Sequence, residues 1–444
     1  MISYQTIAAI RFGYGFHPNQ TPPTEATALL QQLGNHASDL GGPGLHARAR
    51  MLGTVRQARK AKDRDAVKAA TRSIRSVFRD DAAARLTAPV VSPNGFQERL
   101  AWFWADHFTI AARNPHMQAV AGRFEPDTIR PHIAGRFADM LKAAVTHPAM
   151  LIYLDQWRSV GPNSAFGLKR DKGLNENLAR EIIELHTLGV GADYKQSDIG
   201  GFARLLTGLS INKDTGATVF RHRATEPGTH KVLGRAYGPK NNMADILHCL
   251  DDLAAHPATA LHIAQKLARH FVADIPPEDL VQHMTEAYVT SEGSLSVVYG
   301  AMLEHPDSWN TFGAKVKQPF DYVVSGLRAV GINRSALATK TGQKGVKRTT
   351  SMLKLMNQPI WGAPGPDGWP EAAEAWITPQ GLTQRMNWAA GLARRTAKGQ
   401  DPRVFLATAL SDYAHPDTDF AVNAAAEAWE GIAFTLASPE FNRR

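Results

Sequence analysis

The sequence has almost no cysteine. Cys249 is the only one among 444 residues, and it lies within an apolar run. A single thiol excludes an internal disulfide and a metal cluster built on several thiolates. We expect a buried, unreactive side chain. This composition suits either a reducing cytoplasm or an export route that avoids mispaired thiols.

Long apolar runs are absent as well. No stretch approaches the roughly 18 consecutive apolar residues of a transmembrane helix, so no transmembrane segment is expected. The first 12 residues lack the basic leader and apolar stretch of a secretory signal. We therefore expect a cytoplasmic protein, with export alongside a partner as the alternative.

Aromatic residues are nearly missing from the most basic part of the chain, residues 45–88. Its lysines and arginines alternate with good helix formers, which predicts one or two long exposed helices. The net charge of +9 favours a polyanionic or glycan ligand, although solvated basic helices need no such partner. Without stacking platforms, nucleic acid is disfavoured as the partner.

Strand patterns are scarce too. The short segment 217–220 has only 231–233 as a candidate partner, which would make a brief hairpin. We predict a mainly α protein, a large multi-helix assembly with long irregular loops and little or no sheet. The loops are expected at 155–173, 211–242 and 357–380. The expected organisation is one unit over 1–444, with a basic helical arm at 45–88, a helical core at 90–210 and 243–335, and a C-terminal helical part with a tryptophan-bearing loop at 336–444.

A His-Pro pair recurs at His147, His256, His305 and His415. Proline suits the first turn of a helix because its missing N–H is not needed there. We therefore interpret the four histidines as helix-start residues and not as a metal cluster.

The signatures of nucleotide hydrolysis and serine hydrolases are absent. The most polar helical stretch is 175–189, followed by a second helical run at 197–208. At about 100° per residue, one arc of the first helix holds Asn177, Glu181, Glu184 and Leu188. Two glutamates one turn apart can act as general acid and base, bind a metal through oxygen, or pair with arginine.

The second run supplies counter-charges. Ser197 is expected to be the N-cap, with Asp198 in the first turn and Arg204 further along. The short connection predicts two packed helices, so that Arg204 meets Glu181 or Glu184. Arg180 is a second available cation. A buried ion-pair network at this crossing explains the residues as well as catalysis does.

A metal site on the first helix alone is not expected. His186 points away from Glu184, unlike the spacings that place ligands on one side. A divalent metal would need histidines from elsewhere, with His107, His222 and His230 as candidates. His107 lies on an apolar helical stripe, where a hydrogen-bonded core histidine is the alternative.

The loop 357–370 is rich in proline and glycine and holds Trp361, Asp367 and Trp369. Such a frame fits a pocket for a sugar or another flat ligand. The tryptophans could equally pin the loop to the helical body.

Taken together, the motif at 174–190, then Tyr194, Asp198 and 203–208, resembles the signature of the bacterial domain of unknown function 1800 family. Further similar segments are 11–13, 103–108, 150–155, 317–320 and 366–370. Ala105 departs from the family pattern, which tends to have histidine there, and this weakens any role built on that position. The resemblance implies a large helical domain, often exported and often encoded beside a sulfatase-like companion. It implies no established activity.

Two hypotheses remain. The first is a hydrolase or lyase that acts on a polymeric or glycosidic substrate, with acid/base carboxylates on the 175–208 helix pair. Its candidate catalytic residues are Asn177, Glu181, Glu184, Asp198 and Arg204, and its candidate substrate-binding residues are Arg180, Trp361, Asp367 and Trp369. The second is a non-catalytic binding or maturation partner of a companion protein.

Overall fold

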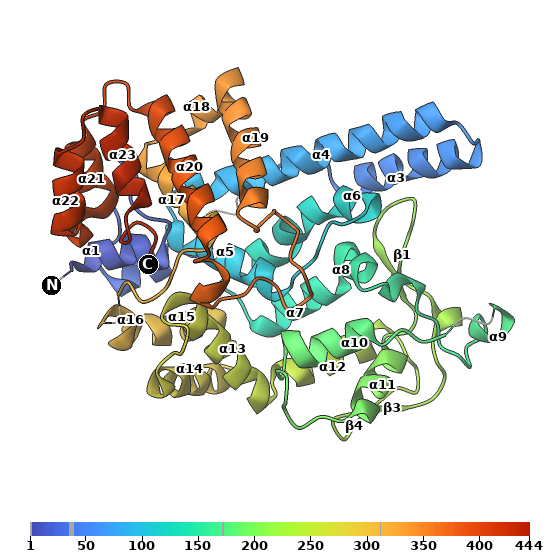
Figure 1. The fold of residues 1–444 in the computed structure, drawn as a ribbon. Helices are drawn as coiled ribbons and strands as arrows, with labels where there is room; N and C mark the ends of the chain where they lie inside the picture. Colours follow the sequence, from blue (N-terminus) through green and yellow to red (C-terminus); the bar gives the residue numbers. More distant parts are fainter. Residues whose placement is uncertain (1, 35–39, 171–172, 311) are drawn as a thin grey trace.

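The structure is a computed structural model that describes residues 2–34, 40–170, 173–310 and 312–444. Helices of many lengths pack around one shared apolar core, and the sheet found in these ranges consists of two short hairpins (Figure 1). The prediction of a mainly α assembly is confirmed. Among the residues described, no helix combines the length and the apolar character that crossing a bilayer requires. The predicted loop at 155–173 includes residues 171–172, which lie outside the described residues.

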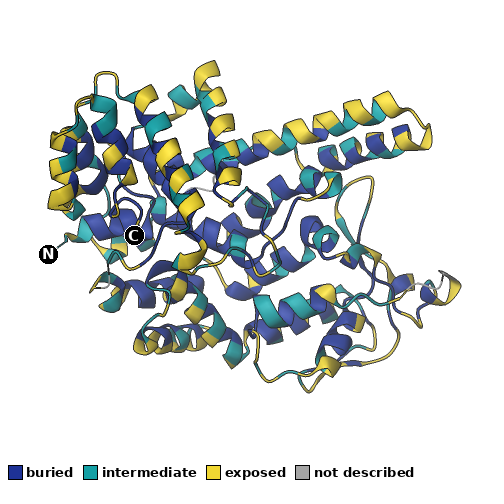
Figure 2. Cartoon of the chain, in the orientation of Figure 1, coloured by how far each residue is buried: buried dark blue, intermediate teal, exposed yellow. Residues whose placement is uncertain are grey.

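The basic segment forms a helical hairpin that projects from the body of the molecule (Figure 1). Its helices are α3 (Leu45–Lys60) and α4 (Arg64–Val91). Asp63 caps α4 by accepting the N–H of Ala66 at 2.9 Å. At the other end, the buried ion pair between Arg48 and Asp81, 2.7 Å long, holds the hairpin. The projecting part is largely exposed (Figure 2).

Helix α5 (Gly95–His107) lies inside the molecule, with nearly every side chain buried. The aromatic rings of Phe96 and Phe271 lie 5.7 Å apart, and the Trp104 indole donates to the Tyr299 hydroxyl at 2.6 Å. Helix α5 packs directly against η1 (Ala8–Phe12) and η2 (Glu125–Ile129), both π-helices, and against α4. The other elements of this part are α1 (Tyr4–Ile7), α2 (Ala26–Gln31), α6 (Pro115–Phe124), η3 (Arg130–His132), α7 (Phe137–Thr146) and α8 (Pro148–Tyr153).

The middle of the chain contains the two hairpins. The described elements are η4 (Gln156–Arg158), α9 (Gly167–Arg170), α10 (Asn177–Glu181), η5 (Ile182–His186), α11 (Gln196–Leu205), β1 (Leu209–Ile211), β2 (Thr218–Phe220), η6 (His222–Ala224), β3 (His230–Val232) and β4 (Arg235–Tyr237). Strand β2 pairs with β1, and β3 pairs with β4. The predicted pairing of 217–220 with 231–233 is therefore wrong, because each strand finds a partner nearer in sequence.

The next helices are α12 (Met243–Ala254), α13 (Pro257–Phe271), α14 (Glu278–Thr290), α15 (Leu295–Glu304), α16 (Asp307–Asn310) and α17 (Pro319–Ala329). The prediction that the four His-Pro histidines stand at helix starts is confirmed. In each, the histidine Nδ1 accepts the backbone N–H two residues later, at 3.1 Å for His147, 3.2 Å for His256, and 3.3 Å for both His305 and His415.

The C-terminal part consists of α18 (Arg334–Ala338), α19 (Lys340–Leu355), η7 (Ala373–Ala375), α20 (Pro379–Thr396), α21 (Pro402–Leu410), η8 (Ser411–Tyr413), α22 (Pro416–Asn423) and α23 (Ala428–Ala437). The loop between α19 and α20 returns to the end of α5, where the N–H of Ala112 donates to the Trp361 carbonyl at 2.8 Å. This loop places the tryptophan-bearing segment beside the central helix.

Candidate functional site

The polar stretch that the sequence singled out begins as α10 and continues as the π-helix η5. A π-turn is wider than an α-turn and is often found at functional sites. Glu181 and Glu184 both remain half-buried, whereas His186 is only 1% exposed. The expected single arc is only partly right, because Asn177 is exposed and Leu188 is buried.

Glu184 is paired, but not with Arg204. Arg180 lies 3.3 Å from the Glu184 carboxylate and 3.5 Å from Glu176, and its guanidinium donates to Gln196 at 3.0 Å. The expected contact with Arg204 is wrong. The first turn of α11, which carries Gln196, meets this helix, and Arg204 lies two turns further on with an exposed side chain.

Asp198 has a structural position. One carboxylate oxygen accepts the N–H of Lys195 at 2.9 Å, and the other accepts the N–H of Leu233, also at 2.9 Å. The N-cap of α11 is therefore Lys195 and not Ser197. Asp198 joins the start of α11 to the β3–β4 turn.

Glu181 keeps a less satisfied carboxylate. Burial raises its pKa, and the negative charges of Glu184 and Asp367 add to the rise, while Arg180 opposes it. Burial also raises the pKa of Tyr153, on which Arg113, Glu181 and Asp367 act through space. The structure thus brings the loop carboxylate Asp367 into electrostatic range of the predicted glutamate.

The two tryptophans of the loop differ. Trp361 is 8% exposed, and the guanidinium of Arg85 lies 5.4 Å from its ring centroid. The Phe78 ring is also 5.4 Å away. Trp361 therefore pins the loop to the body. Trp369 is only half-buried, which leaves part of its ring available to a ligand.

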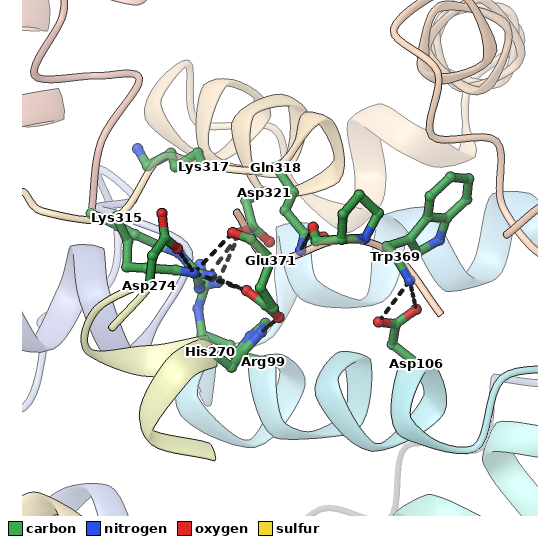
Figure 3. A network of polar contacts seen from close by, with 12 residues as sticks. Arg99, Asp106, His270, Asp274, Lys315, Lys317, Gln318, Asp321, Trp369 and Glu371 are labelled. Carbon is green, nitrogen blue, oxygen red and sulfur yellow. Dashed lines mark hydrogen bonds and ion pairs between the residues drawn. The ribbon is translucent and has the colours of Figure 1, made fainter. Parts of the chain in front are cut away.

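Asp106, near the end of α5, lies under this loop (Figure 3). Its two carboxylate oxygens accept the N–H of Trp369 at 3.1 and 3.2 Å. Gly368 makes this approach possible, because its φ is +87° and a Cβ there would lie 2.8 Å from the Asp106 carboxylate. Burial raises the pKa of Asp106 from 3.8 to about 7.

Lys266 of α13 faces the same region. Burial lowers the pKa of its ammonium group, against the opposing effect of Asp106, Glu371 and Asp367. These three carboxylates act on it through space, without a direct ion pair within the described part of the chain. Lys266 also lines an open pocket of about 650 Å³ between α13 and α14, together with His262 and Arg269. We call this the Lys266 pocket.

Three histidines surround the inner end of this region. The ring centroid of His107 lies 5.9 Å from that of His186 and 6.3 Å from that of His262. Nε2 of His107 donates to the His186 carbonyl at 3.1 Å, and Nε2 of His262 donates to the Leu185 carbonyl at 3.1 Å. Burial lowers the pKa of His186 to about 3 and that of His262 to about 4, so these rings are neutral at physiological pH.

The metal candidates taken from the sequence do not meet. His107 belongs to the buried group just described, His222 is exposed, and His230 donates to the Glu226 carbonyl at 3.2 Å. Among the described residues, the group of potential metal ligands that lie within reach of one another is Asp279, His305 and Asp307. In that group the Nδ1 of His305 is already occupied as a helix cap.

A second charge cluster, which we call the Glu371 network, lies next to the site (Figure 3). Glu371 contacts His270 at 2.5 Å and Lys315 at 3.1 Å, and Lys315 also contacts Asp274 at 2.6 Å. Burial acts to raise the pKa of Glu371, but His270 and Lys315 hold it well below its usual value. Asp321, 3.0 Å from Arg99, continues the network.

Sequence reasoning missed Asp106, Lys266 and Glu371. A signal existed for Asp106, since it is one of the few charged residues within the apolar helix 96–108. Lys266 stands in an ordinary amphipathic helix, where lysine usually marks the solvated face. The partial burial of Lys266 arises only from the tertiary structure, so the sequence pattern does not indicate it.

One family sequence model, described as Protein of unknown function (DUF1800), matches residues 7–443, nearly the whole chain. No curated protein and no solved structure matches the chain.

Proposed function

We propose that this chain, which belongs to the DUF1800 family, is an acid–base enzyme: a hydrolase or lyase that acts on a polymeric or glycosidic substrate at the Lys266 pocket. The supporting observation is Lys266 itself. This half-buried lysine lines an open pocket and has no direct ion pair among the described residues, while three carboxylates from two other segments, Asp106 on α5 and Asp367 and Glu371 in the loop before α20, act on it through space. Keeping an unpaired cation in this place lowers stability, which is typical of catalytic and binding sites.

The residues divide naturally into an acid and a base. Asp106 lines a small cavity under the loop and not the Lys266 pocket itself. Burial raises its pKa to about 7, so a large fraction of it carries a proton for a leaving oxygen that reaches this cavity. The lowered pKa of Lys266 increases its neutral fraction, which can remove a proton from substrate or water. Two groups with pKa values displaced toward each other are the usual arrangement for acid–base work.

Other side chains fit roles in substrate binding. Arg269 lines the pocket and supplies a fixed positive charge for an acidic sugar. Trp369 offers a partly open aromatic face for a sugar ring. Glu181 and Asp367 lie within mutual electrostatic range, and Asp367 also acts on Lys266 through space. The pocket lining carries Glu278 and Glu286 as well as Lys266 and Arg269, so the panel of substrates must include both acidic and neutral glycans.

The test is degradation of a panel of acidic and neutral polysaccharides by the full chain. New reducing ends without ultraviolet absorbance indicate hydrolysis, and reducing ends with absorbance from a new double bond indicate elimination. Lys266→Met is expected to lower the rate by about 100-fold or more. Lys344→Met, a change on an exposed helix face, serves as the matched control. An unchanged rate in Lys266→Met, or no degradation of any polysaccharide, contradicts the proposal.

A second candidate function is that of a non-catalytic partner for a companion protein. The pairing of Glu184 with Arg180 and the exposed basic hairpin α3–α4 favour it. Under this alternative the hairpin is the contact surface, and charge reversal at Arg72 and Arg75 abolishes binding of the companion. Lys266→Met would leave that binding intact.

A further inference from the structure

A small cavity lies beside α3 and shares no lining residue with the Lys266 pocket. Its volume is about 200 Å³. Elements from four parts of the fold line it: α3, α6, α8 with η4, and the loop that joins β1 to β2. The lining is mainly apolar, with Ala49, Leu52, Val120, Ile152 and Ile211 among its side chains.

The loop between β1 and β2 closes the cavity against α3. Gly216 has φ +75°, and a Cβ there would lie 2.9 Å from the Leu45 carbonyl, so only glycine allows the loop to approach this closely. The guanidinium of Arg56 donates to the Lys213 carbonyl at 3.0 Å and fixes the two sides together. The cavity therefore has a defined wall that the sequence maintains.

The rim of the cavity is cationic. Arg56, His116 and Lys213 line it. The pKa of His116 is lowered by burial and then by Arg59, Arg158, Arg56 and Lys213, so four positive groups converge on one ring. The compensating carboxylates are weakly engaged, with Asp214 at 3.6 Å from Arg56 and Asp155 at 3.6 Å from Arg158. A net positive field remains at the mouth.

A buried donor without a protein partner adds a second, independent observation. Trp157 lines the cavity, and its indole N–H is buried without a hydrogen-bond acceptor among the described residues. Leaving such a donor unsatisfied costs about 1 to 3 kcal/mol, so a bound acceptor is the usual explanation. Lys213 lies over the same indole, 5.2 Å from the ring centroid.

We propose that this cavity binds a small amphiphilic carboxylate, with the apolar tail among Leu52, Val120 and Ile152 and the carboxylate at Lys213 and Arg56. The apolar lining selects the tail, and the cationic rim selects an anionic head over a neutral or cationic one. The site is independent of the Lys266 pocket, so it does not depend on the function proposed above.

The experiment is calorimetric titration of the full chain with three probes of equal tail length: octanoate, octanol and octylammonium. Octanoate is expected to bind most tightly. Lys213→Gln should weaken octanoate by about fivefold and leave octanol unchanged, because only the charge is lost. Lys340→Gln, an exposed lysine on α19, is the matched control and should leave all three titrations unchanged.

Two variants address the cavity itself. Ala49→Phe fills it and should abolish binding of octanoate. Trp157→Phe keeps the aromatic ring but removes the N–H, so it should weaken the binding of octanoate. This variant keeps the proposal testable if Ala49→Phe does not fold. The proposal is overturned if octanoate gives no binding, if octanol or octylammonium binds equally well, or if a folded Ala49→Phe variant still binds octanoate.

Discussion

Two lysines act on the same carboxylate, Glu371, but they have opposite surroundings. Lys315 is buried to 1% side-chain exposure and contacts both Asp274 and Glu371 directly. Lys266 lines an open pocket, and its carboxylates act only through space in the part of the chain described. Direct contacts neutralise the charge of Lys315. The charge of Lys266 has no such contact among the described residues and stays available to a ligand. The difference separates a structural ion network from a site that can accept a ligand.

The largest expected effect separates these two lysines by stability. Lys315→Met leaves Asp274 and Glu371 without their common cation, and we expect the free energy of unfolding to fall by about 4 kcal/mol. Lys266→Met removes a half-buried cation that has no ion pair among the described residues, so we expect an unchanged or slightly higher stability. Urea unfolding followed by circular dichroism measures both.

The two methionine variants control for each other, since each removes one ammonium group from a buried helical or loop position. Equal losses of stability would mean that Lys266 is held by contacts as firmly as Lys315. In that case Lys266 would be a structural residue like Lys315, and the Lys266 pocket would not differ from the Glu371 network.

The two tryptophans of the loop extend the comparison to packing. Trp361→Ala removes a ring that is 8% exposed and packed against Arg85 and Phe78, so we expect a loss of about 3 kcal/mol. Trp369→Ala affects a half-buried ring and should lower the stability clearly less. It should also weaken the binding of a glycan substrate. Thermal unfolding together with the degradation assay tests both statements. If Trp361→Ala loses less stability than Trp369→Ala, Trp361 is not the tryptophan that holds the loop against the body, and the two roles must be exchanged.

Asp106 makes the stability of the folded chain depend on pH. Its pKa is raised by burial from 3.8 in the unfolded chain to about 7 in the folded one, so the folded state holds the proton more tightly. The resulting stabilisation is complete below about pH 4 and is lost as the pH rises through about 7. Asp106→Asn resembles the protonated form and avoids this loss.

We therefore expect the stability of Asp106→Asn, relative to the unchanged chain, to increase by up to about 4 kcal/mol between about pH 4 and pH 8. Urea midpoints at a series of pH values measure this difference. Asp139→Asn, on an exposed carboxylate, provides the control. Parallel pH profiles for Asp106→Asn and the unchanged chain would show that Asp106 ionises normally.

The fold class and the helix starts at the His-Pro pairs were predictable because they depend on local patterns, whereas the N-cap of α11 was placed wrongly, at Ser197 instead of Lys195. Apolar periodicity and missing β-branched alternation indicated helices, and the His-Pro pairs indicated caps, as at His256. The pairing of strands failed, since β1 gave little strand signal on its own. Short strands depend more on context than on propensity.

The candidate site was only partly predictable for a related reason. Sequence reasoning found polar residues on one helix, including Glu181, but it could not show which segment covers them. The loop that carries Asp367 and Trp369 bonds to Asp106 across more than 250 positions, and its Asp367 acts on Lys266 through space across about 100. The helical wheel also assumes a regular α-helix, whereas residues 182–186 form the wider π-turn η5.

The smallest effect is expected at the residue that the sequence favoured most. Glu184 is partly exposed and pairs with Arg180 at 3.3 Å, and a surface ion pair contributes about 0 to 1 kcal/mol. Glu184→Gln should therefore change stability by less than about 1 kcal/mol and leave the rate of glycan degradation nearly unchanged. Glu181→Gln, its neighbour one turn away, should lower that rate more, because the Glu181 carboxylate faces Asp367 with Arg180 as its opposing charge. If Glu184→Gln loses more activity than Glu181→Gln, direct pairing does not mark a structural residue here. The acid–base centre then belongs on the helix pair 175–208 and not at Lys266.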